Sequence, residues 1–440
     1  MESYAPVVND NTTRMLTALS TLFGWHTHQA DATLAYLNSK LPADKHIYMT
    51  QVTGFREGSQ SENLVCKLLQ SLYGLVPSAR IWYDTLGAYL RHIGFKCSDY
   101  DSGLWIHTTR AQLYVTTHVD DFKVYAKAEP DANWFMETLS AKFDIKEVGN
   151  ARSTKYLGTE ISQSDTTTSL SQAEYAEDLV ASFGLANAHP VGIPMDPGLI
   201  IDDAPDPQIN ATEYQRGTGS LNWLATKTRP DLSRTVGVLA PFNTKPTQKA
   251  WRALIHALRY LKGSINRPIP YTKPKEPIQP TDLVPRCYTD SDWGGPLTGN
   301  RRSVSGYVFL LAGAPIAWRS RKQSSVALSS NEAEYMALSE ASRDALWLRN
   351  LLNELKVLSI DCPPITIHID NQGAHAMAEA ELTTKRSKHI DIRYHYIREK
   401  VQDGIIKLQT CPSQDQAADG LTKPLRTEPF ERFLALNGLN

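Results

Sequence analysis

Two adjacent carboxylates, Asp120 and Asp121, stand in the stretch THVDDFKV between two runs of β-forming residues. Leu113–Val115 begins the first run and Phe122–Tyr125 alternates in the second, so the pair falls in the turn of a predicted hairpin. An Asp-Asp pair is common at a solvated hairpin tip, because both residues suit turns. The same turn can also project both side chains toward one metal ion, and at this point both interpretations stay open.

Four more carboxylates lie at the ends of predicted strands and helices in the last third of the chain. They are Asp290 after the run CYT, Glu334 in the first turn of a helix capped by Ser329 or Ser330, Asp370 after Ile365–Ile369, and Asp419 after Ile405–Cys411. Clustered carboxylates repel each other and bind protons unless a divalent cation neutralises them. Mg²⁺ takes oxygen ligands, and two such ions about 4 Å apart serve phosphoryl displacement. We therefore predict two Mg²⁺ ions per active site, with Mn²⁺ as a substitute.

The elements that must position these acids divide the chain into five segments. Residues 1–175 combine a helical opening, strand-like runs and the hairpin. Residues 176–265 contain a Pro- and Asp-rich loop followed by a mostly helical stretch, and residues 266–282 are a Pro- and Lys-rich linker. Residues 283–425 alternate strands and helices like a compact α/β domain, and residues 426–440 form a tail. The fold class predicted from this order is α+β.

Composition excludes several classes of protein. At 440 residues the chain should hold two or three domains, and no apolar run approaches the roughly 18 residues of a membrane span. The first residues lack a basic start and an apolar stretch, so we expect an intracellular, cytoplasmic protein with no membrane partner. Five widely spaced cysteines without a Cys-x-x-Cys pair indicate neither a disulfide framework nor a zinc site.

Basic residues gather in three clusters, although the formal net charge is only -1. A phosphate-binding surface needs local positive charge, which carboxylates elsewhere can cancel in the sum. Each cluster alone is typical of a solvated face, but three of them around further acids favour nucleic-acid binding. The candidate contacts are Arg301, Arg302, Arg319, Arg321, Lys322, Lys385, Arg386 and Lys388.

The motifs of the chain, taken in order, resemble a known family. They are similar to motifs in the reverse transcriptase and ribonuclease H portion of copia-type retrotransposon polyproteins. The motifs are VCKLLQSLYGL, the VDD turn, YLGTEIS, LSQAEY, TRPDL, RYLKGS, YTDSDWGG, RRSVSGYVFLLAGAPIAW, KQSSVALSSNEAEYMA, KHIDIRYHYIRE and ADGLTKPL. The resemblance spans nearly the whole chain. No single motif would justify this resemblance; the order in which the motifs occur makes it specific.

The resemblance implies roles for individual residues. Asp31, in QADATLAYLN, matches the first polymerase carboxylate, which acts with Asp120 and Asp121. Tyr36 matches the aromatic that excludes a ribose 2′-hydroxyl, and an ordinary core aromatic is the open alternative. Two residues of SLYGL match the segment against the templating pair and incoming nucleotide: Tyr73 and Gly74. The ribonuclease H acids match Asp290, Glu334, Asp370 and Asp419, whereas the spacing of Asp292 fits less well.

The resemblance also implies an architecture and partners. It implies a palm-like domain with partial fingers, a helical thumb or connection region, and a ribonuclease H-like domain with a mixed sheet. The implied partners are an RNA template, a DNA primer, an RNA–DNA hybrid, dNTPs and other products of the polyprotein. The implied locations then include virus-like particles and the nucleus.

Three functions remain open at this point. The first is RNA-directed DNA synthesis coupled to hydrolysis of the RNA strand, which the survival of all seven acids favours. The start, YAPVV, resembles a point inside the family's reverse transcriptase, so we expect the preceding fingers strands to be missing and synthesis to be impaired. The alternatives are an inactive remnant that only binds nucleic acid and a ribonuclease H without polymerase activity.

Overall fold

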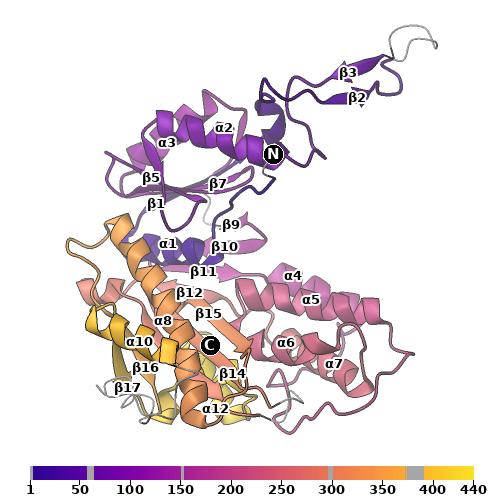
Figure 1. The fold of residues 1–440 in the computed structure, drawn as a ribbon, viewed down its shortest axis with the longest axis vertical. Helices are drawn as coiled ribbons and strands as arrows, with labels where there is room; N and C mark the ends of the chain where they lie inside the picture. Colours follow the sequence, from indigo (N-terminus) through magenta and orange to yellow (C-terminus); the bar gives the residue numbers. More distant parts are fainter. Residues whose placement is uncertain (1–2, 57–63, 150–152, 296–300, 372, 374–390) are drawn as a thin grey trace. The chain divides into compact units, whose positions relative to one another are not determined.

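The computed structural model describes residues 3–56, 64–149, 153–295, 301–371, 373 and 391–440. The chain forms two compact units (Figure 1). The first unit comprises Met1–Thr13 and Gly24–Ala151, and the second comprises Arg14–Phe23 and Arg152–Asn440. Helix α1 (Asp10–Phe23) therefore contributes residues to both units.

The first unit is built on a six-stranded antiparallel sheet with the strand order β4-β5-β6-β7-β1-β8. A separate two-stranded sheet pairs β2 with β3. The bounds are β1 (His26–Ala32), β2 (Tyr48–Thr50), β3 (Val65–Lys67), α2 (Ser78–His92), β4 (Phe95–Cys97), β5 (Leu104–His107), β6 (Leu113–His118), β7 (Asp121–Ala126), α3 (Glu129–Ser140) and β8 (Ile145–Gly149), with a 3-10 turn η1 (Ala35–Asn38).

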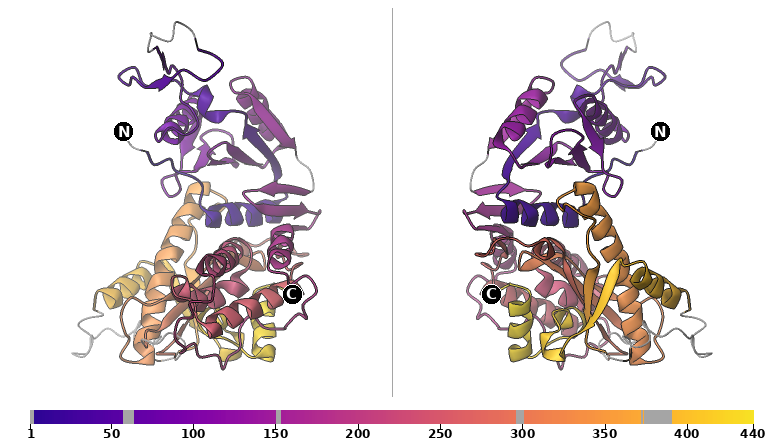
Figure 2. Two further views of the ribbon diagram at one scale, coloured as in Figure 1. Left: turned by 90° about the vertical axis from the view of Figure 1, so that its right-hand side faces the viewer. Right: turned by 90° about the vertical axis from the view of Figure 1, so that its left-hand side faces the viewer.

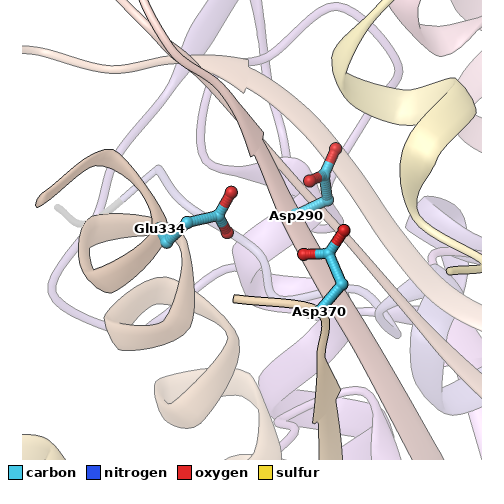
Figure 3. A group of neighbouring side chains, drawn as sticks. All are labelled: Asp290, Glu334 and Asp370. Atoms are coloured by element: carbon cyan, nitrogen blue, oxygen red, sulfur yellow. The ribbon is translucent and has the colours of Figure 1, made fainter. Parts of the chain in front are cut away.

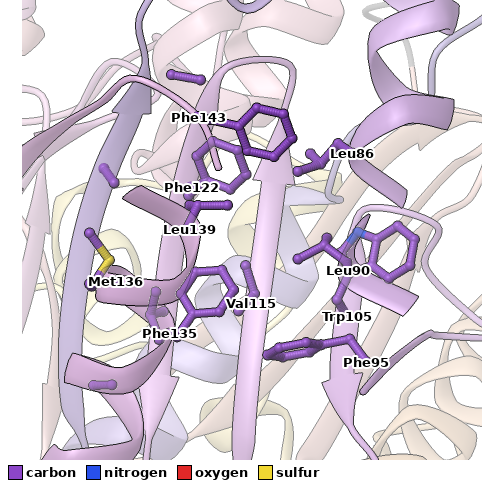
Figure 4. Packing of buried hydrophobic residues seen from close by; sticks show 14 of the residues in the cluster. Leu86, Leu90, Phe95, Trp105, Val115, Phe122, Phe135, Met136, Leu139 and Phe143 are labelled. Carbon is purple, nitrogen blue, oxygen red and sulfur yellow. The ribbon is translucent and has the colours of Figure 1, made fainter. Parts of the chain in front are cut away.

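Helices α2 and α3 pack against the six-stranded sheet and form its core. Helix α2 presents Trp82, Leu86 and Leu90 at four-residue spacing, which places them on one helix face. Helix α3 adds Phe135 and Leu139, and both helices meet buried sheet residues (Figure 4). This core fixes strands β7 and β1, whose ends carry the first set of carboxylates.

The second unit begins with a four-stranded sheet and a helical region. The sheet has the order β12-β11-β10-β9, and all its pairs are antiparallel. The bounds are β9 (Ser153–Tyr156), β10 (Thr159–Gln163), β11 (Thr167–Ser171), α4 (Ala173–Ser182), α5 (Ala211–Lys227), η2 (Pro230–Leu232), α6 (Ser233–Leu239), η3 (Ala240–Phe242), α7 (Gln248–Gly263), β12 (Ile269–Thr272) and η4 (Pro280–Leu283).

A five-stranded mixed sheet follows, with the order β15-β14-β13-β16-β17. Strands β13, β16 and β17 run parallel, whereas β14 and β15 are antiparallel additions. The bounds are β13 (Arg286–Asp292), β14 (Val304–Leu311), β15 (Ala314–Lys322), α8 (Ser330–Leu355), β16 (Ile365–Ile369), α10 (Asp391–Gln402), β17 (Ile406–Thr410), η6 (Ser413–Asp415), α11 (Asp419–Thr422) and α12 (Thr427–Leu436).

The two faces of this mixed sheet are covered by different helices (Figure 2). On one face, the Tyr307 hydroxyl donates a hydrogen bond to Asp344 of α8. On the other face, the neighbouring Gly306 lies so close to α11 that a Cβ would meet Thr422 at 2.6 Å. Helix α6 also packs against α11 and β15. The helical region and the mixed sheet therefore share one packed face within the second unit.

The structure differs from the predicted segments in three places. Compact packing divides the chain near residue 151 rather than 175, because β9–β11 pair with β12 in the second unit. The stretch predicted as a linker contains β12, in which Ile269 and Tyr271 are fully buried. Residues 426–440 contain α12, which buries Phe430 and Phe433. None of the described helices combines the length and apolar character that crossing a membrane requires.

Candidate active sites

The second set of carboxylates converges because neighbouring elements of the mixed sheet end together. Tyr288 of β13 is the parallel partner of His368 in β16, so Asp290 and Asp370, each two residues further on, come side by side. Glu334 enters from α8 just after its first turn, and the helix begins where the Ser329 side chain accepts a hydrogen bond from the Glu332 amide. The predicted N-cap is thus confirmed at Ser329.

Asp290, Glu334 and Asp370 form a tight carboxylate cluster (Figure 3). One carboxylate oxygen from each lies within 4.8 Å of the others, and the three side chains point toward one another. Within the described residues, no other group of three His, Cys, Asp or Glu side chains meets this distance. Asp290 and Glu334 are only 3% and 8% exposed. Buried carboxylates this close together need a cation or protons to offset their charge.

The electrostatics of the cluster favour bound protons when no cation is present. Burial, and then the charges of Asp290 and Asp370, raise the pKa of Glu334 to about 9. Burial, and then Asp290, also raise the pKa of Asp370. The amide N–H of Ser291 donates to Glu334 Oε1 at 3.2 Å and fixes the carboxylate at this position. A divalent cation held by these oxygens would replace the protons.

Asp419, the fourth predicted acid, is joined to the cluster through a lysine. It is the first residue of α11, and its Oδ1 atom lies 2.8 Å from Lys423 Nζ. The same ammonium lies 3.8 Å from Asp290 Oδ2, which also accepts a hydrogen bond from the Thr422 hydroxyl. Lys423 is a charged neighbour that sequence reasoning missed. Its place four residues after Asp419 on a helical turn was the available signal.

Asp292 lies on the same strand as Asp290 but outside the tight cluster. Its side chain is half-buried, and burial raises its pKa while Arg234 lowers it. Alternation along β13 places Asp290 and Asp292 on the same face of the sheet. Asp292 therefore stands beside the cluster rather than in it.

The first set of carboxylates lies at a hairpin, as the sequence predicted. His118 of β6 pairs with Asp121 of β7, which leaves Val119 and Asp120 as a two-residue turn. Val119 has a φ of 58°, a conformation that costs a β-branched residue about 1–3 kcal/mol. The Trp82 indole N–H donates to the Val119 carbonyl at 2.6 Å and supports this backbone.

Asp31 lies across from the turn, on strand β1. It is the direct cross-strand partner of Asp121, and the Ala32 amide donates to the Asp120 carbonyl at 2.9 Å. Burial, and then Asp120 and Asp31, raise the pKa of Asp121 to about 6. All three acids are partly exposed. The arrangement gathers three carboxylates at one edge but more openly than in the second unit.

Two aromatic residues flank this hairpin. The rings of Tyr36 and Tyr73 stand 4.6 Å apart between centroids. Burial and the charge of Asp120 raise the pKa of both tyrosines, so both lie near the turn. Tyr73 is 48% exposed, and the adjacent Gly74 has a φ of 92°, which favours glycine. Tyr36, by contrast, is partly buried against the core of the first unit.

Among the described residues, the basic candidates of β15 lie on both faces of the mixed sheet. Register places Arg319 beside Tyr307 on the α8 face, and Lys322 beside Val304 on the opposite face. Arg321 shares the strand face of Arg319, while Arg301 and Arg302 are exposed before β14. The third cluster lies outside the described residues: Lys385, Arg386 and Lys388.

Comparison with known proteins identifies relatives along the whole chain. Residues 1–197 match the family model described as reverse transcriptase (RNA-dependent DNA polymerase). The retrovirus-related Pol polyproteins from transposons RE2 and RE1 of Arabidopsis thaliana are each 34% identical, over 98% and 100% of this chain. The alignment covers 29% of each relative, so this chain spans less than a third of their length.

A solved structure of a foamy viral protease-reverse transcriptase in complex with dsDNA has a TM-score of 0.48 and 12% identity, over 90% of this chain and 70% of that one. That similarity is too low to establish a shared fold. The sequence matches confirm the resemblance drawn from the motifs. This chain belongs to the family of retrotransposon Pol polyproteins that carry the reverse transcriptase domain.

Proposed function

We propose that the chain hydrolyses the RNA strand of an RNA–DNA hybrid at Asp290, Glu334 and Asp370. The observation that carries this proposal is the approach of the three carboxylates within 4.8 Å at a largely buried position. Such a cluster is costly for folding, and a metal-dependent reaction accounts for it. Membership in the retrotransposon family makes nucleic acid the substrate class.

The donor set fits Mg²⁺, with Mn²⁺ as a substitute. All the candidate ligands are carboxylate oxygens, which Mg²⁺ prefers, and burial together with mutual repulsion raises the pKa of Glu334 and of Asp370. Asp290, Glu334 and Asp370 would hold the ions, and Asp419 would complete the set. Two bound Mg²⁺ ions supply stabilisation of the attacking and leaving oxygens of an in-line displacement.

The residues of the chain position the reaction in three ways. The Ser291 amide holds Glu334 toward the cluster, and the Thr422 hydroxyl holds Asp290. Lys423 balances part of the negative charge of Asp290 and Asp419. Because the ribose 2′-hydroxyl and the groove shape of the hybrid distinguish RNA, we expect cleavage of the RNA strand only.

The second proposed function is RNA-directed DNA synthesis at Asp31, Asp120 and Asp121. Cross-strand pairing of Asp31 with Asp121, beside a turn that carries Asp120, supports it. These acids would hold the metal ions that also bind the phosphates of a dNTP, with a DNA primer on an RNA template. Tyr36, Tyr73 and Gly74 would border the nucleotide.

One paired assay with the full chain separates these functions. A hybrid labelled on its RNA strand reports cleavage, and a labelled DNA primer on an RNA template reports synthesis, each with Mg²⁺ or EDTA. Cleavage and extension together support both proposals, and cleavage alone leaves only the nuclease. Binding without either product would establish the alternative of an inactive nucleic-acid binder.

A further inference from the structure

Arg234 is a buried arginine with unsatisfied nitrogens in the helical region of the second unit. It lies in the first turn of α6 and is 4% exposed. Its Nε and Nη2 atoms have no hydrogen-bond partner within the described part of the chain. Guanidinium nitrogens that are hidden from water without hydrogen-bond partners are costly, because their hydration is lost and no hydrogen bond replaces it. An anion that accepts hydrogen bonds from these nitrogens would offset the cost.

The surroundings of Arg234 are richer in cations than in anions. Asp292 is the acid that acts on it electrostatically, while burial lowers the Arg234 pKa to about 10. Burial, then Arg302, and then Arg234 lower the pKa of Lys322, so three cations share this region. Asp292, Val304 and Lys322 are consecutive partners across β13, β14 and β15. Asp292 therefore lies in a row with Lys322 and acts electrostatically on Arg234.

This cationic region lies next to the carboxylate cluster. Asp292 follows Asp290 by two residues on the same strand face, a separation of about 7 Å. Arg234 and Asp292 act on each other electrostatically, so Arg234 belongs to the surroundings of Asp292. A nucleic-acid strand that is cleaved at Asp290 and continues along β13 would pass Asp292 and present a neighbouring phosphate there.

The chemistry of the guanidinium matches a phosphodiester. Its planar fork of donors binds two phosphate oxygens at once, whereas an ammonium acts as a point charge. We propose that Arg234, with Lys322 and Arg302 beside it, binds a backbone phosphate of the nucleic acid next to the bond that is cleaved. This inference rests on the proposed nuclease function, because it requires the hybrid to lie across Asp290.

The test measures hybrid binding rather than cleavage. Fluorescence anisotropy of a short labelled RNA–DNA hybrid gives Kd for the full chain in EDTA, across about 50–200 mM salt. We expect Arg234→Met to weaken binding about tenfold at low salt and to reduce the slope of log K against log salt by about 0.9. Arg252→Met, which removes an exposed arginine on α7, is the control and should leave both quantities unchanged.

Two further variants separate phosphate binding from a structural role. Arg234→Lys keeps the charge but not the fork, so it should preserve the slope and recover only part of the affinity. Lys322→Met alone should weaken binding, and adding it to Arg234→Met should cost less than the sum, because both residues contact one phosphate. Should Arg234→Met not fold, Arg234→Lys and Lys322→Met still give these results.

The outcomes distinguish this inference from the proposed function. A wild-type chain that binds and cleaves hybrid, with Kd and slope unchanged in Arg234→Met, would show that Arg234 only pairs with Asp292. Unchanged binding in both Arg234→Lys and Lys322→Met would overturn the inference equally. A wild-type chain that does not bind hybrid at all would overturn the nuclease proposal and this inference together.

Discussion

The carboxylates of the first unit and those of the second unit differ in how completely the fold assembles them. Asp290, Glu334 and Asp370 come from two parallel strands and a helix, and their oxygens approach within 4.8 Å. Asp31 and Asp121 come from antiparallel strands at an open edge, and with Asp120 they do not meet that distance. In the second set Asp290 and Glu334 are buried and Asp370 is partly exposed, whereas all three acids of the first set are partly exposed.

The difference indicates what each site still needs from its substrate. A nucleophilic water requires little room, so a closed cluster suits hydrolysis. A nucleotide triphosphate brings its own phosphates and must enter, so an open edge with two exposed or half-exposed aromatics suits synthesis. The electrostatics agree, because burial raises the pKa of Glu334 to about 9 but that of the more exposed Asp121 only to about 6.

The largest expected effect is a separation of the two activities by single substitutions. Glu334→Gln should reduce RNA cleavage roughly a hundredfold to a thousandfold, because losing a metal ligand costs several kcal/mol of stabilisation. Any primer extension that the wild type shows should be unchanged in this variant. Asp121→Asn should give the converse result, and Glu428→Gln on α12 is the control. Loss of both activities in either variant would contradict two independent sites.

A smaller effect is expected at Tyr36. If Tyr36 borders the ribose, Tyr36→Val should raise ribonucleotide incorporation relative to deoxynucleotides about tenfold, since a lost steric contact is worth roughly 1–3 kcal/mol. Tyr36→Phe keeps the ring and should retain discrimination, and RNA cleavage should not change in either. Equal discrimination in wild type and Tyr36→Val would assign Tyr36 to the core, the alternative left open by the sequence.

A third prediction concerns Lys423, which faces Asp290 and Asp419. Lys423→Met should destabilise the metal-free protein by about 1–2 kcal/mol, a value reduced by the partial exposure of the ammonium. Mg²⁺ should recover most of this loss, because it supplies the missing charge. Thermal unfolding in EDTA measures the destabilisation, and thermal unfolding in Mg²⁺ measures its recovery. Lys407→Met on β17 is the control. If Lys423→Met and Lys407→Met destabilised the protein equally, Lys423 would not be balancing the charge of the carboxylates.

The smallest effect is a pH dependence of stability that distinguishes the two sites. The Glu334 pKa is raised from 4.5 to about 9, so the folded protein holds a proton that the unfolded chain releases. The stabilisation that this bound proton gives to the folded protein is fully present below pH 4.5 and is lost as pH rises toward 9. Between about pH 7 and 9, the unfolding midpoint in EDTA should fall by a few °C.

Substitutions assign that decline to one site. Glu334→Gln should flatten it, whereas Asp121→Asn should not, because the Asp121 pKa of about 6 lies below this range. A decline of equal size in wild type and Glu334→Gln would mean that the proton is held elsewhere.

Local patterns in the sequence predicted the elements that carry the acids. The alternation around Asp120 predicted the hairpin, and the serine pair Ser329-Ser330 predicted the start of α8; both are confirmed, with Ser329 as the N-cap. The mixed sheet, implied by the family resemblance, is also present. These features depend on residues close together in the chain or on motifs with a fixed order.

Features that depend on long-range packing were not predicted. Lys423 and Arg234 acquire their surroundings only when α11 and α6 pack on the mixed sheet. The Pro- and Lys-rich composition of residues 266–282 predicts a linker, whereas β12 forms there because it pairs with β11, about 100 residues earlier in the chain. The basic residues of β15 alternate between faces, so adjacency in sequence overstated their closeness in space.

The most direct test of the central claim is cleavage of an RNA–DNA hybrid by the full chain and its Asp370→Asn variant. The substitution keeps the side-chain size but weakens the metal site, and Asp361→Asn in the exposed loop before β16 is the matched control. We predict Mg²⁺-dependent cutting of the RNA strand by the wild type and the control, none of the DNA strand, and loss of cutting in Asp370→Asn. Undiminished cleavage by Asp370→Asn would contradict the assignment of the site.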